Sequence, residues 1–188
     1  PMAKALIDAG HAVTVFDARR ESATGLCETG ADWADTPREL SEASEVVFTS
    51  LPGPVEAEQV LTDPDTGILA GLKTGGAWID TTTNSPTTIH KLADICKQRG
   101  IEMLDSPVSG RIPNMTMMVG GDPAVFERYR AVLETMGKDV IYVGGTASGC
   151  TAKLVTQYLG YSNFIAGIEG MLIGAKAGLD MDILAKLI

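Results

Sequence analysis

Residues 146–178, TASGCTAKLVTQYLGYSNFIAGIEGMLIGAKAG, separate an alternating α/β pattern from the end of this 188-residue chain. The stretch is rich in helix-forming residues, and Gly178 is a natural helix C-terminus. Ser148 is placed to cap the helix start by accepting a hydrogen bond from a first-turn N–H. Apolar side chains lie on all sides of the helix, so we expect it to be buried. They are Leu154, Leu159, Ile165, Ile168, Leu172 and Ile173.

One charged residue, Lys153, lies one turn inside this predicted helix. Burying an ammonium group is costly unless the group has a partner or a chemical task. One interpretation is therefore a functional lysine. The other is a lysine whose aliphatic stem packs on the protein while its charged end stays in water.

The residues before the helix alternate between short apolar strands and helices. The expected strands are AVTVFD (12–17), EVVFTS (45–50), a segment ending near Asp80, IEMLD (101–105) and DVIYVG (139–144). Predicted helices lie between them, for example RESATGLCETG (20–30) after Asp17. A second example is TPRELSEASE (36–45), with Thr36 as its start signal and Pro37 in its first turn. This alternation predicts an α/β fold in which helices cover both faces of a parallel sheet.

Ligands of an open parallel sheet bind at the carboxyl ends of its strands. Four expected strand ends carry polar or turn-forming residues, namely Asp17, Ser50–Pro52, Thr81–Thr83 and Ser106–Gly110. An acid that ends the second strand of such a sheet holds a ribose hydroxyl of a dinucleotide. Taken alone, Asp17 fits a solvated turn or a helix cap equally well. Its company with the other three strand ends favours a binding role.

Arg19 and Arg20 bear on the identity of that dinucleotide. Arginines just after this strand accommodate the 2′-phosphate of NADP, whereas the carboxylate of Asp17 would repel it. Because the acid occupies the strand end itself, we favour NAD and keep NADP as the alternative. The two arginines also fit a solvated helix start.

The composition excludes several other classes of function. A net charge of -9 argues against a nucleic-acid surface or an anionic membrane surface, since both need clustered Lys and Arg. The three cysteines are far apart and lack a CxxC pattern, as expected for reduced thiols of an intracellular protein. His11 and His90 are too isolated for a metal site built on histidine or a Ser-His-Asp triad. No signal-peptide pattern is present, so we expect a cytoplasmic protein without a membrane span.

A phosphate-binding GxGxxG motif would be expected between a first strand and the first helix of a dinucleotide-binding sheet. This sequence begins with PMAKALIDAGH, which has the pattern of the second half of a helix. The first strand and the glycine loop are therefore missing from these 188 residues, either because the protein lacks them or because the sequence is a fragment.

In combination, the motifs of this chain resemble those of the β-hydroxyacid dehydrogenases, the family of 3-hydroxyisobutyrate dehydrogenase and tartronate semialdehyde reductase. The resemblance runs over essentially the whole chain. The similar segments are PMAKALIDAGHAVTVFD (1–17), SLP (50–52), DTTTNSP (80–86), DSPVSG (105–110), MVGGD (118–122) and the GxxxK pattern of 149–153.

The resemblance implies a Rossmann-like NAD(P)-binding domain over residues 1–145, without its first strand and glycine loop. Residues 146–188 would then form a linking helix and the start of a C-terminal helical domain. The implied activity is hydride transfer between a nicotinamide and a 3-hydroxy acid, or the corresponding semialdehyde. An apolar helix such as 149–178 needs a covering partner, either that helical domain or a second subunit, and a homodimer or homotetramer is implied.

The family pattern also assigns roles to individual residues. Lys153 would be the catalytic residue and hydrogen-bond the hydroxyl oxygen of the substrate. Ser109 and Gly110 would hold the substrate carboxylate, with Gln157 assisting one helical turn after the lysine. The implied cofactor-binding residues are Asp17, Arg19, Leu51, Pro52, Thr82 and Thr83.

Two departures from the family pattern concern the substrate pocket. Gln157 stands where the family usually has Asn, and Arg111 stands where Gly is usual in a loop that is several residues shorter here. Arg111 fits a contact with a second acidic group of a substrate. It equally fits a solvated loop position, which we favour.

Other functions remain open at this stage. One alternative is a catalytically silent dimerising or binding module on the same fold, because fold does not dictate function. Another is an imine reductase, which Lys153 disfavours because members of that group usually replace the lysine. We expect a small-molecule substrate, and no metal, nucleic-acid or membrane partner.

Overall fold

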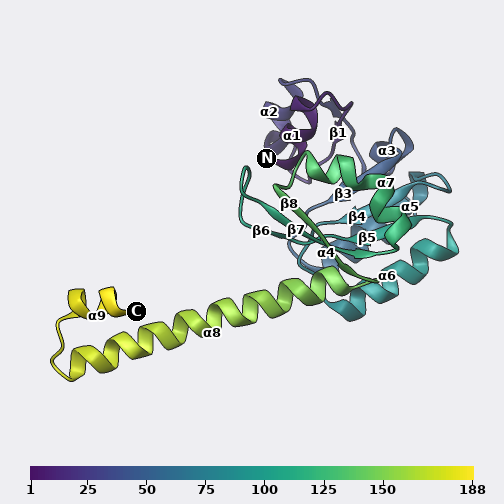
Figure 1. The fold of residues 1–188 in the computed structure, drawn as a ribbon. Coiled ribbons are helices and arrows are strands. Elements are labelled where there is room, and N and C mark those ends of the chain that lie inside the picture. Colours follow the sequence, from purple (N-terminus) through teal and green to yellow (C-terminus); the bar gives the residue numbers. More distant parts are fainter. The chain divides into compact units, whose positions relative to one another are not determined.

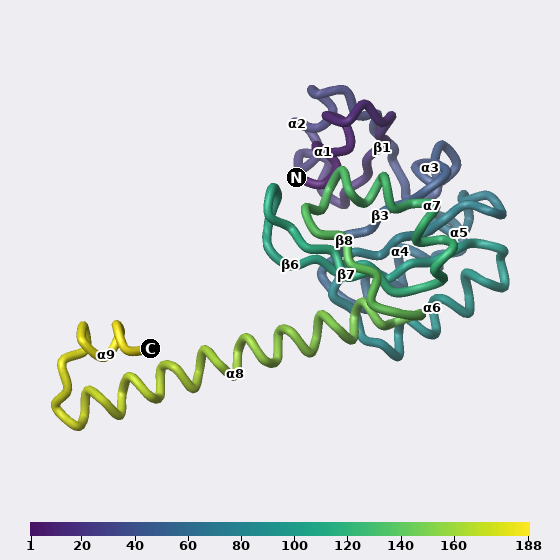
Figure 2. Tube along the Cα trace, viewed as in Figure 1, coloured from purple at the N-terminus to yellow at the C-terminus, as the bar shows by residue number.

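A computed structural model describes residues 1–188, which divide into two compact units, Pro1–Lys153 and Leu154–Ile188. Figure 1 labels the helices and strands, and Figure 2 follows the chain by residue number. In chain order they are α1 (Met2–Asp8), β1 (Thr14–Val15), η1 (Arg20–Ala23), α2 (Thr24–Cys27), β2 (Asp32–Trp33), α3 (Pro37–Glu42), β3 (Val46–Thr49), α4 (Pro54–Thr62), α5 (Ile68–Gly71), β4 (Ala77–Asp80), α6 (Pro86–Gln98), β5 (Glu102–Asp105), β6 (Val108–Ser109), β7 (Thr116–Gly121), α7 (Pro123–Glu134), β8 (Asp139–Gly144), α8 (Ser148–Lys176) and α9 (Met181–Leu187).

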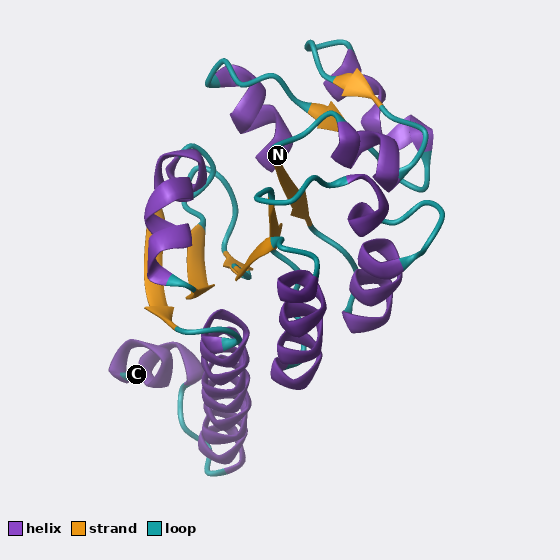
Figure 3. Cartoon of the chain, turned by 90° about the vertical axis from the view of Figure 1, so that its right-hand side faces the viewer, coloured by secondary structure: helices purple, strands orange, loops and turns teal.

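The first unit contains two sheets. Six strands form a mixed sheet in the order β3–β4–β5–β7–β6, and β8 pairs with β7. β3, β4 and β5 are parallel, whereas β7 runs antiparallel to β5. The ten residues between β5 and β7 are too few for the crossover that a parallel connection needs, so the chain turns back through β6. β1 and β2 form a separate parallel pair, which Figure 3 shows apart from the larger sheet.

Helices cover both faces of the larger sheet, as predicted for an α/β fold of Rossmann type. Trp78 and Ile79 are neighbours on β4 and therefore point to opposite faces. Trp78 packs in a cluster with residues from α4, α5 and α6. Ile79 belongs to a second cluster, with residues from α7 and Leu6 from α1. Both side chains are fully buried, which fixes the strand between the two helical layers.

Three helices of the first unit begin with the same local pattern, a polar cap followed by proline. The side chain of Thr36 accepts a hydrogen bond from Glu39 N, as expected for the start of α3. Ser85 caps α6 and Asp122 caps α7 in the same manner. A proline in the first helical turn loses nothing, because its missing N–H would have no partner inside the helix. These sequence signals therefore fix where the helices start.

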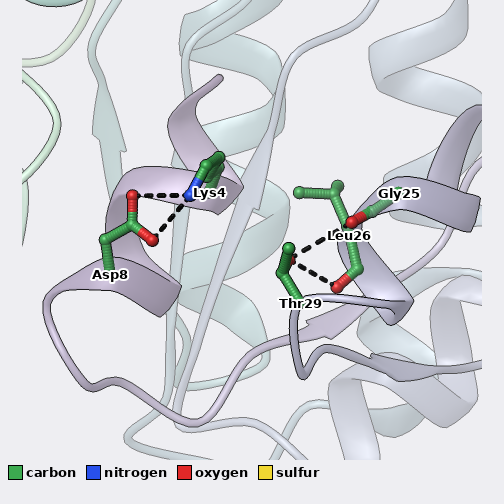
Figure 4. Close-up of polar contacts among 5 residues, drawn as sticks. All are labelled: Lys4, Asp8, Gly25, Leu26 and Thr29. Atoms are coloured by element: carbon green, nitrogen blue, oxygen red, sulfur yellow. Dashed lines mark hydrogen bonds and ion pairs between the residues drawn. The ribbon is translucent and has the colours of Figure 1, made fainter.

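The N-terminal segment is less regular than its sequence pattern suggests. The predicted strand over 12–17 is reduced to β1, the helix expected after Asp17 is split into η1 and α2, and the short strand β2 was not expected. Local contacts stabilise this region (Figure 4). The hydroxyl of Thr29 donates to the carbonyl oxygens of Gly25 and Leu26 at the end of α2, and Lys4 pairs with Asp8 on α1.

A groove of about 1000 Å³ lies between β1 and β3. Its walls come from both strands, from α1 and from α7, and it extends to Asp17, Ser50 and Thr81 at the carboxyl ends of the strands. β1 pairs with β2 on its other edge, and β3 pairs with β4. The groove therefore separates the two sheets and reaches the edge where ligands of such sheets bind.

The second unit contains the rest of α8 and the helix α9. The predicted long helix is present, and in the single chain its apolar side chains are exposed. Leu154 is 41% exposed and Ile173 is 69% exposed, and the other apolar side chains named for this helix fall between them. A covering partner for this surface stays a prediction. None of the helices combines the length and the apolar character that crossing a bilayer requires.

The core on the α6 side of the sheet yields a test of this fold. Leu92 is fully buried in the cluster around Trp78, so Leu92→Ala should lower the free energy of unfolding by about 2–5 kcal/mol. Lys97 lies on the exposed side of the same helix, and Lys97→Ala should change it by less than about 0.5 kcal/mol. Urea denaturation of both variants measures the difference, and equal stabilities would contradict the assigned core.

Candidate active site

The carboxyl ends of β3, β4 and β5 are aligned, which brings Thr49, Asp80 and Asp105 into register. Asp80 is fully buried and accepts hydrogen bonds from the Thr49 hydroxyl at 2.9 Å and the Thr82 N–H at 3.1 Å. Asn84 donates to its second oxygen at 3.2 Å. Asp80 therefore organises the segment that follows β4.

The segments after β3 and β4 are also tied directly to each other. The Leu51 N–H donates to the Thr82 hydroxyl oxygen at 3.0 Å, and the Thr81 hydroxyl donates to the Thr49 carbonyl at 2.7 Å. Four predicted cofactor-binding residues therefore lie on two linked loops. Thr82 is buried and Leu51 half-buried, whereas Pro52 and Thr83 are exposed. The exposed pair offers a surface to a ligand, and the Thr82 hydroxyl is already engaged with the backbone.

Asp105 connects the third strand end to the start of α8. Its two carboxylate oxygens accept the N–H groups of Ala147 at 2.8 Å and Cys150 at 2.7 Å. The expectation that Ser148 caps this helix is wrong, because Ser148 is already helical and a first-turn N–H is bound by Asp105. A carboxylate from 42 residues earlier takes that place. It also complements the positive end of the helix dipole.

Two glycines permit this close contact. A Cβ atom on Gly149 would overlap the carbonyl oxygens of Asp105 and Met118. A Cβ on Gly120 would lie 2.5 Å from the Asp105 carboxylate. The GxxxK pattern seen in the sequence thus has a packing reason for its glycine, since the first turn of α8 lies directly against β5 and β7.

Burial raises the pKa of both strand-end carboxyl groups. For Asp80 the hydrogen bonds from Thr82, Asn84 and Thr49 oppose that effect. For Asp105 the N–H groups of Cys150 and Ala147 do so. Burial likewise raises the pKa of the neighbouring Cys150 thiol to about 12, so this cysteine stays protonated near neutral pH. It is a packing residue beside the two carboxyl groups.

Lys153 lies one turn after Gly149 and is only 9% exposed. This burial favours a functional lysine over one whose charged end extends into water. The proposed carboxylate-binding residues Ser109 and Gly110 are exposed at the end of β6, on the segment that continues from Asp105. Gly110 has φ of +80°, and a Cβ there would approach the Asn114 carbonyl at 2.6 Å. Gln157 is half-buried in the second unit, one turn further along α8.

Asp17 follows β1 and is exposed. Its Oδ1 accepts the Arg19 N–H at 2.9 Å, which holds the carboxylate beside the backbone turn. A carboxylate can accept several hydrogen bonds, so the group retains acceptor capacity for ribose hydroxyls. An exposed carboxylate at a strand end, beside the groove between β1 and β3, is a hydrogen-bond acceptor that fits the ribose hydroxyls in the adenosine half of a dinucleotide.

Comparison with known families agrees with this geometry. Residues 1–144 match the model of the NAD-binding domain of 6-phosphogluconate dehydrogenase. The chain belongs to this family. Membership accounts for the layered α/β unit and for the cluster of polar residues at its strand ends.

Two relatives that resemble the chain over its whole length are dehydrogenases by name. The chain is 33% identical to 2-(hydroxymethyl)glutarate dehydrogenase of Eubacterium barkeri and 35% identical to 3-hydroxyisobutyrate dehydrogenase of Pseudomonas aeruginosa, with 100% of the chain and 64% of each relative covered. A solved structure of Mycobacterium tuberculosis 3-hydroxyisobutyrate dehydrogenase with L-serine superimposes with a TM-score of 0.90 at 30% identity, covering 96% of the chain and 62% of that structure. The chain thus spans somewhat less than two thirds of these relatives.

Sequence reasoning missed the structural roles of Asp80 and Asp105. Both residues stood inside the motifs DTTTNSP and DSPVSG, yet no function was assigned to either carboxylate. The available signal was an acid at the end of each of two successive apolar strands. Such an acid is either solvated or buried against backbone N–H groups, and only the tertiary contacts distinguish the two.

The contact at the start of α8 predicts opposite effects of the same substitution at two glycines. Gly149→Ala should lower the free energy of unfolding by about 1–3 kcal/mol, because the rigid carbonyl oxygens cannot yield to the new Cβ. Gly160 lies in the same helix with open space around its Cβ direction, and Gly160→Ala should stabilise the helix by up to about 1 kcal/mol. Thermal unfolding of the two variants distinguishes them, and a neutral Gly149→Ala would refute the assigned contact.

The buried Asp80 predicts a pH dependence of stability. Because its pKa is raised in the folded state, the folded protein binds more protons than the unfolded chain above the ordinary carboxyl pKa of about 3.9. The contribution of Asp80 to stability should therefore fall as the pH rises through that window. Denaturation at pH 4 and pH 7 should show a smaller advantage of wild type over Asp80→Asn at pH 7.

A control with the opposite sign is available. Backbone N–H groups of Thr66 and Asp65 lower the pKa of exposed Asp63, so its contribution is present at neutral pH and lost on acidification. Asp63→Asn should therefore be less stable relative to wild type at neutral pH than at acidic pH. The assignment of Asp80 fails if its variant follows the same trend as Asp63→Asn.

Proposed function

We propose that the protein is a dehydrogenase that transfers a hydride between NAD and a 3-hydroxy acid or its semialdehyde, with NADP as the alternative cofactor. The observation that carries this proposal is the placement of Lys153. It is buried on the first turns of a helix whose start is bound by Asp105, and the exposed Ser109–Gly110 segment continues from that same Asp105.

The roles of the residues follow from their chemistry. Lys153 carries three N–H donors and would hydrogen-bond the substrate oxygen that is a hydroxyl in the acid and a carbonyl in the semialdehyde. Ser109 and Gly110 would hold the substrate carboxylate through a hydroxyl and backbone N–H groups. Gln157 would hydrogen-bond the substrate through its side-chain amide. Holding the substrate at both ends orients the carbon that exchanges the hydride.

A bound nicotinamide would supply the hydride acceptor or donor. The residues at the carboxyl ends of β1, β3 and β4, among them Asp17, Ser50 and Thr81, support its binding there. Asp17 would accept the ribose hydroxyls, and Arg19 would fix Asp17 through its backbone N–H. Leu51, Pro52, Thr82 and Thr83 would line the path towards Lys153. A strand placed in the groove would pair with the free edges of β1 and β3 and join the two sheets.

The names of the relatives support this class of substrate. 2-(Hydroxymethyl)glutarate and 3-hydroxyisobutyrate are both acids with a hydroxyl group on the carbon β to a carboxylate. The first is a dicarboxylate, and Arg111 would be a candidate contact for the second carboxylate of such a substrate. Arg111 is exposed in the turn after Gly110. We propose a small-molecule 3-hydroxy acid and leave its side chain open.

We further propose the domain division and the assembly that the sequence suggested. Residues 1–145 would form the NAD-binding domain, and residues 146–188 the linking helix and the start of a helical domain. The exposed apolar side chains of α8 support a homo-oligomer or a further helical domain as their cover. A cytoplasmic location accords with the composition.

Replacement of the lysine tests the proposal. Lys153→Ala should reduce kcat with 3-hydroxyisobutyrate by about 10²–10⁴-fold, because the hydrogen bond to the reacting oxygen is lost. The dissociation constant for NADH should stay within about twofold, since Lys153 is assigned to the substrate. Lys97→Ala, an exposed lysine on α6, is the control and should keep wild-type turnover.

The results also separate the proposal from a silent binding module. Wild-type protein that binds NADH but turns over no 3-hydroxy acid would favour the module. Unchanged turnover in Lys153→Ala would remove the lysine from the mechanism while leaving the dehydrogenase class intact.

A further inference from the structure

Four residues near the end of β1 form a cluster around an indole ring, which we call the Trp33 cluster (Phe16, Arg20, Trp33 and Asp35). The Arg20 guanidinium carbon lies 5.0 Å from the centroid of the Trp33 ring. Arg20 Nη1 is also 3.5 Å from Asp35 Oδ1. Phe16 directly follows β1, and the centroid of its ring lies 6.1 Å from that of the Trp33 ring. The Arg20 side chain therefore contacts two residues at the end of β2, Trp33 and Asp35.

Asp35 is itself held in place by the side chains of Glu39 and Trp33. The same Oδ1 that faces Arg20 accepts the Trp33 indole N–H at 2.7 Å. The Asp35 N–H donates to a carboxylate oxygen of Glu39 at 2.9 Å, and the Glu39 N–H is bound by the Thr36 cap of α3. Asp35 thus has a defined position beside the indole, although its side chain is exposed.

This cluster bears on the choice between NAD and NADP because of the position of Arg20 in the sequence. Arg20 comes three residues after Asp17, at the point where an arginine can bind the 2′-phosphate of NADP. A guanidinium binds phosphate through paired N–H groups and its positive charge. Asp35 offsets part of that charge at 3.5 Å, and the guanidinium lies over the indole face, where a cation is attracted by the ring.

We propose that Asp35 is a specificity-determining residue that favours NAD over NADP by holding Arg20 on Trp33. The inference rests on the proposed function, in which Asp17 receives the ribose of the cofactor. The ion pair between Asp35 and Arg20 would disfavour NADP in addition to the repulsion between Asp17 and a 2′-phosphate. Removing the charge of Asp35 should free Arg20 for the phosphate and add one unit of positive charge to the site.

The substitution Asp35→Asn tests this assignment with little change of shape. Asparagine keeps an oxygen that can accept the Trp33 indole N–H, while the ion pair with Arg20 is lost. We expect the dissociation constant for NADPH to fall about three- to fivefold, the size of an exposed ion pair, and that for NADH to change less than about twofold. Calorimetric titration of the full-length native protein with NADH and with NADPH measures both constants without relying on turnover.

Two further variants identify the cause. Glu28→Gln removes the same charge from an exposed residue after α2 that forms no ion pair with Arg20 and does not line the groove, and it should leave the NADH to NADPH preference unchanged. Arg20→Gln combined with Asp35→Asn should restore the wild-type preference, because the released guanidinium is then absent.

Each other outcome overturns the inference. An unchanged preference in Asp35→Asn, or an equal shift in Glu28→Gln, means that Asp35 does not act through Arg20. A shift that persists in the double variant assigns the phosphate to another group, such as Arg19. If wild-type protein binds neither nucleotide, the proposed function fails together with this inference, whereas NADH binding with an unchanged preference removes the inference alone.

Discussion

The carboxylate of Asp105 at the start of α8 is the contact on which the candidate site depends. A helix start exposes N–H groups without partners, and a buried carboxylate needs hydrogen-bond donors. Each group here meets the need of the other, since Ala147 and Cys150 donate to the two oxygens of Asp105. The pairing also joins the end of β5 to the beginning of the helix that carries Lys153. Any shift of that helix would expose or orphan both sides of the contact.

The same arrangement recurs one strand away. Asp80 binds donors from the end of β3 and from its own following loop, so the segments after β3 and β4 are fixed together. The buried carboxyl groups thereby serve as supports, and the residues available to a ligand lie next to them in sequence. Pro52, Thr83 and Ser109 are exposed, whereas Asp80 and Asp105 are buried. A rigid buried layer with exposed residues above it is a suitable basis for orienting a substrate.

The sequence was sufficient for the features that local rules decide. Thr36, Ser85 and Asp122 begin helices because each is a polar cap followed by proline, and those rules act within one turn. Alternating strands and helices were sufficient to predict an α/β unit. The resemblance to β-hydroxyacid dehydrogenases located the motifs at the strand ends. Less of the N-terminal segment was predicted, because β1 and β2 are two residues each and their pattern is too short to be distinguished from a loop.

Local chemistry and periodicity, read from the sequence by itself, determined the α/β class and the starts of α3, α6 and α7. Only the tertiary structure decided which partner each polar group takes. The start of α8 illustrates this, because Ser148 has the right chemistry for a cap, yet Asp105 provides the hydrogen bonds from 42 residues away. The ion pair between Arg20 and Asp35, which are 15 residues apart, is of the same kind. Hydrogen bonds and ion pairs between distant segments depend on how strands are placed in space, and sequence spacing carries no direct record of that placement.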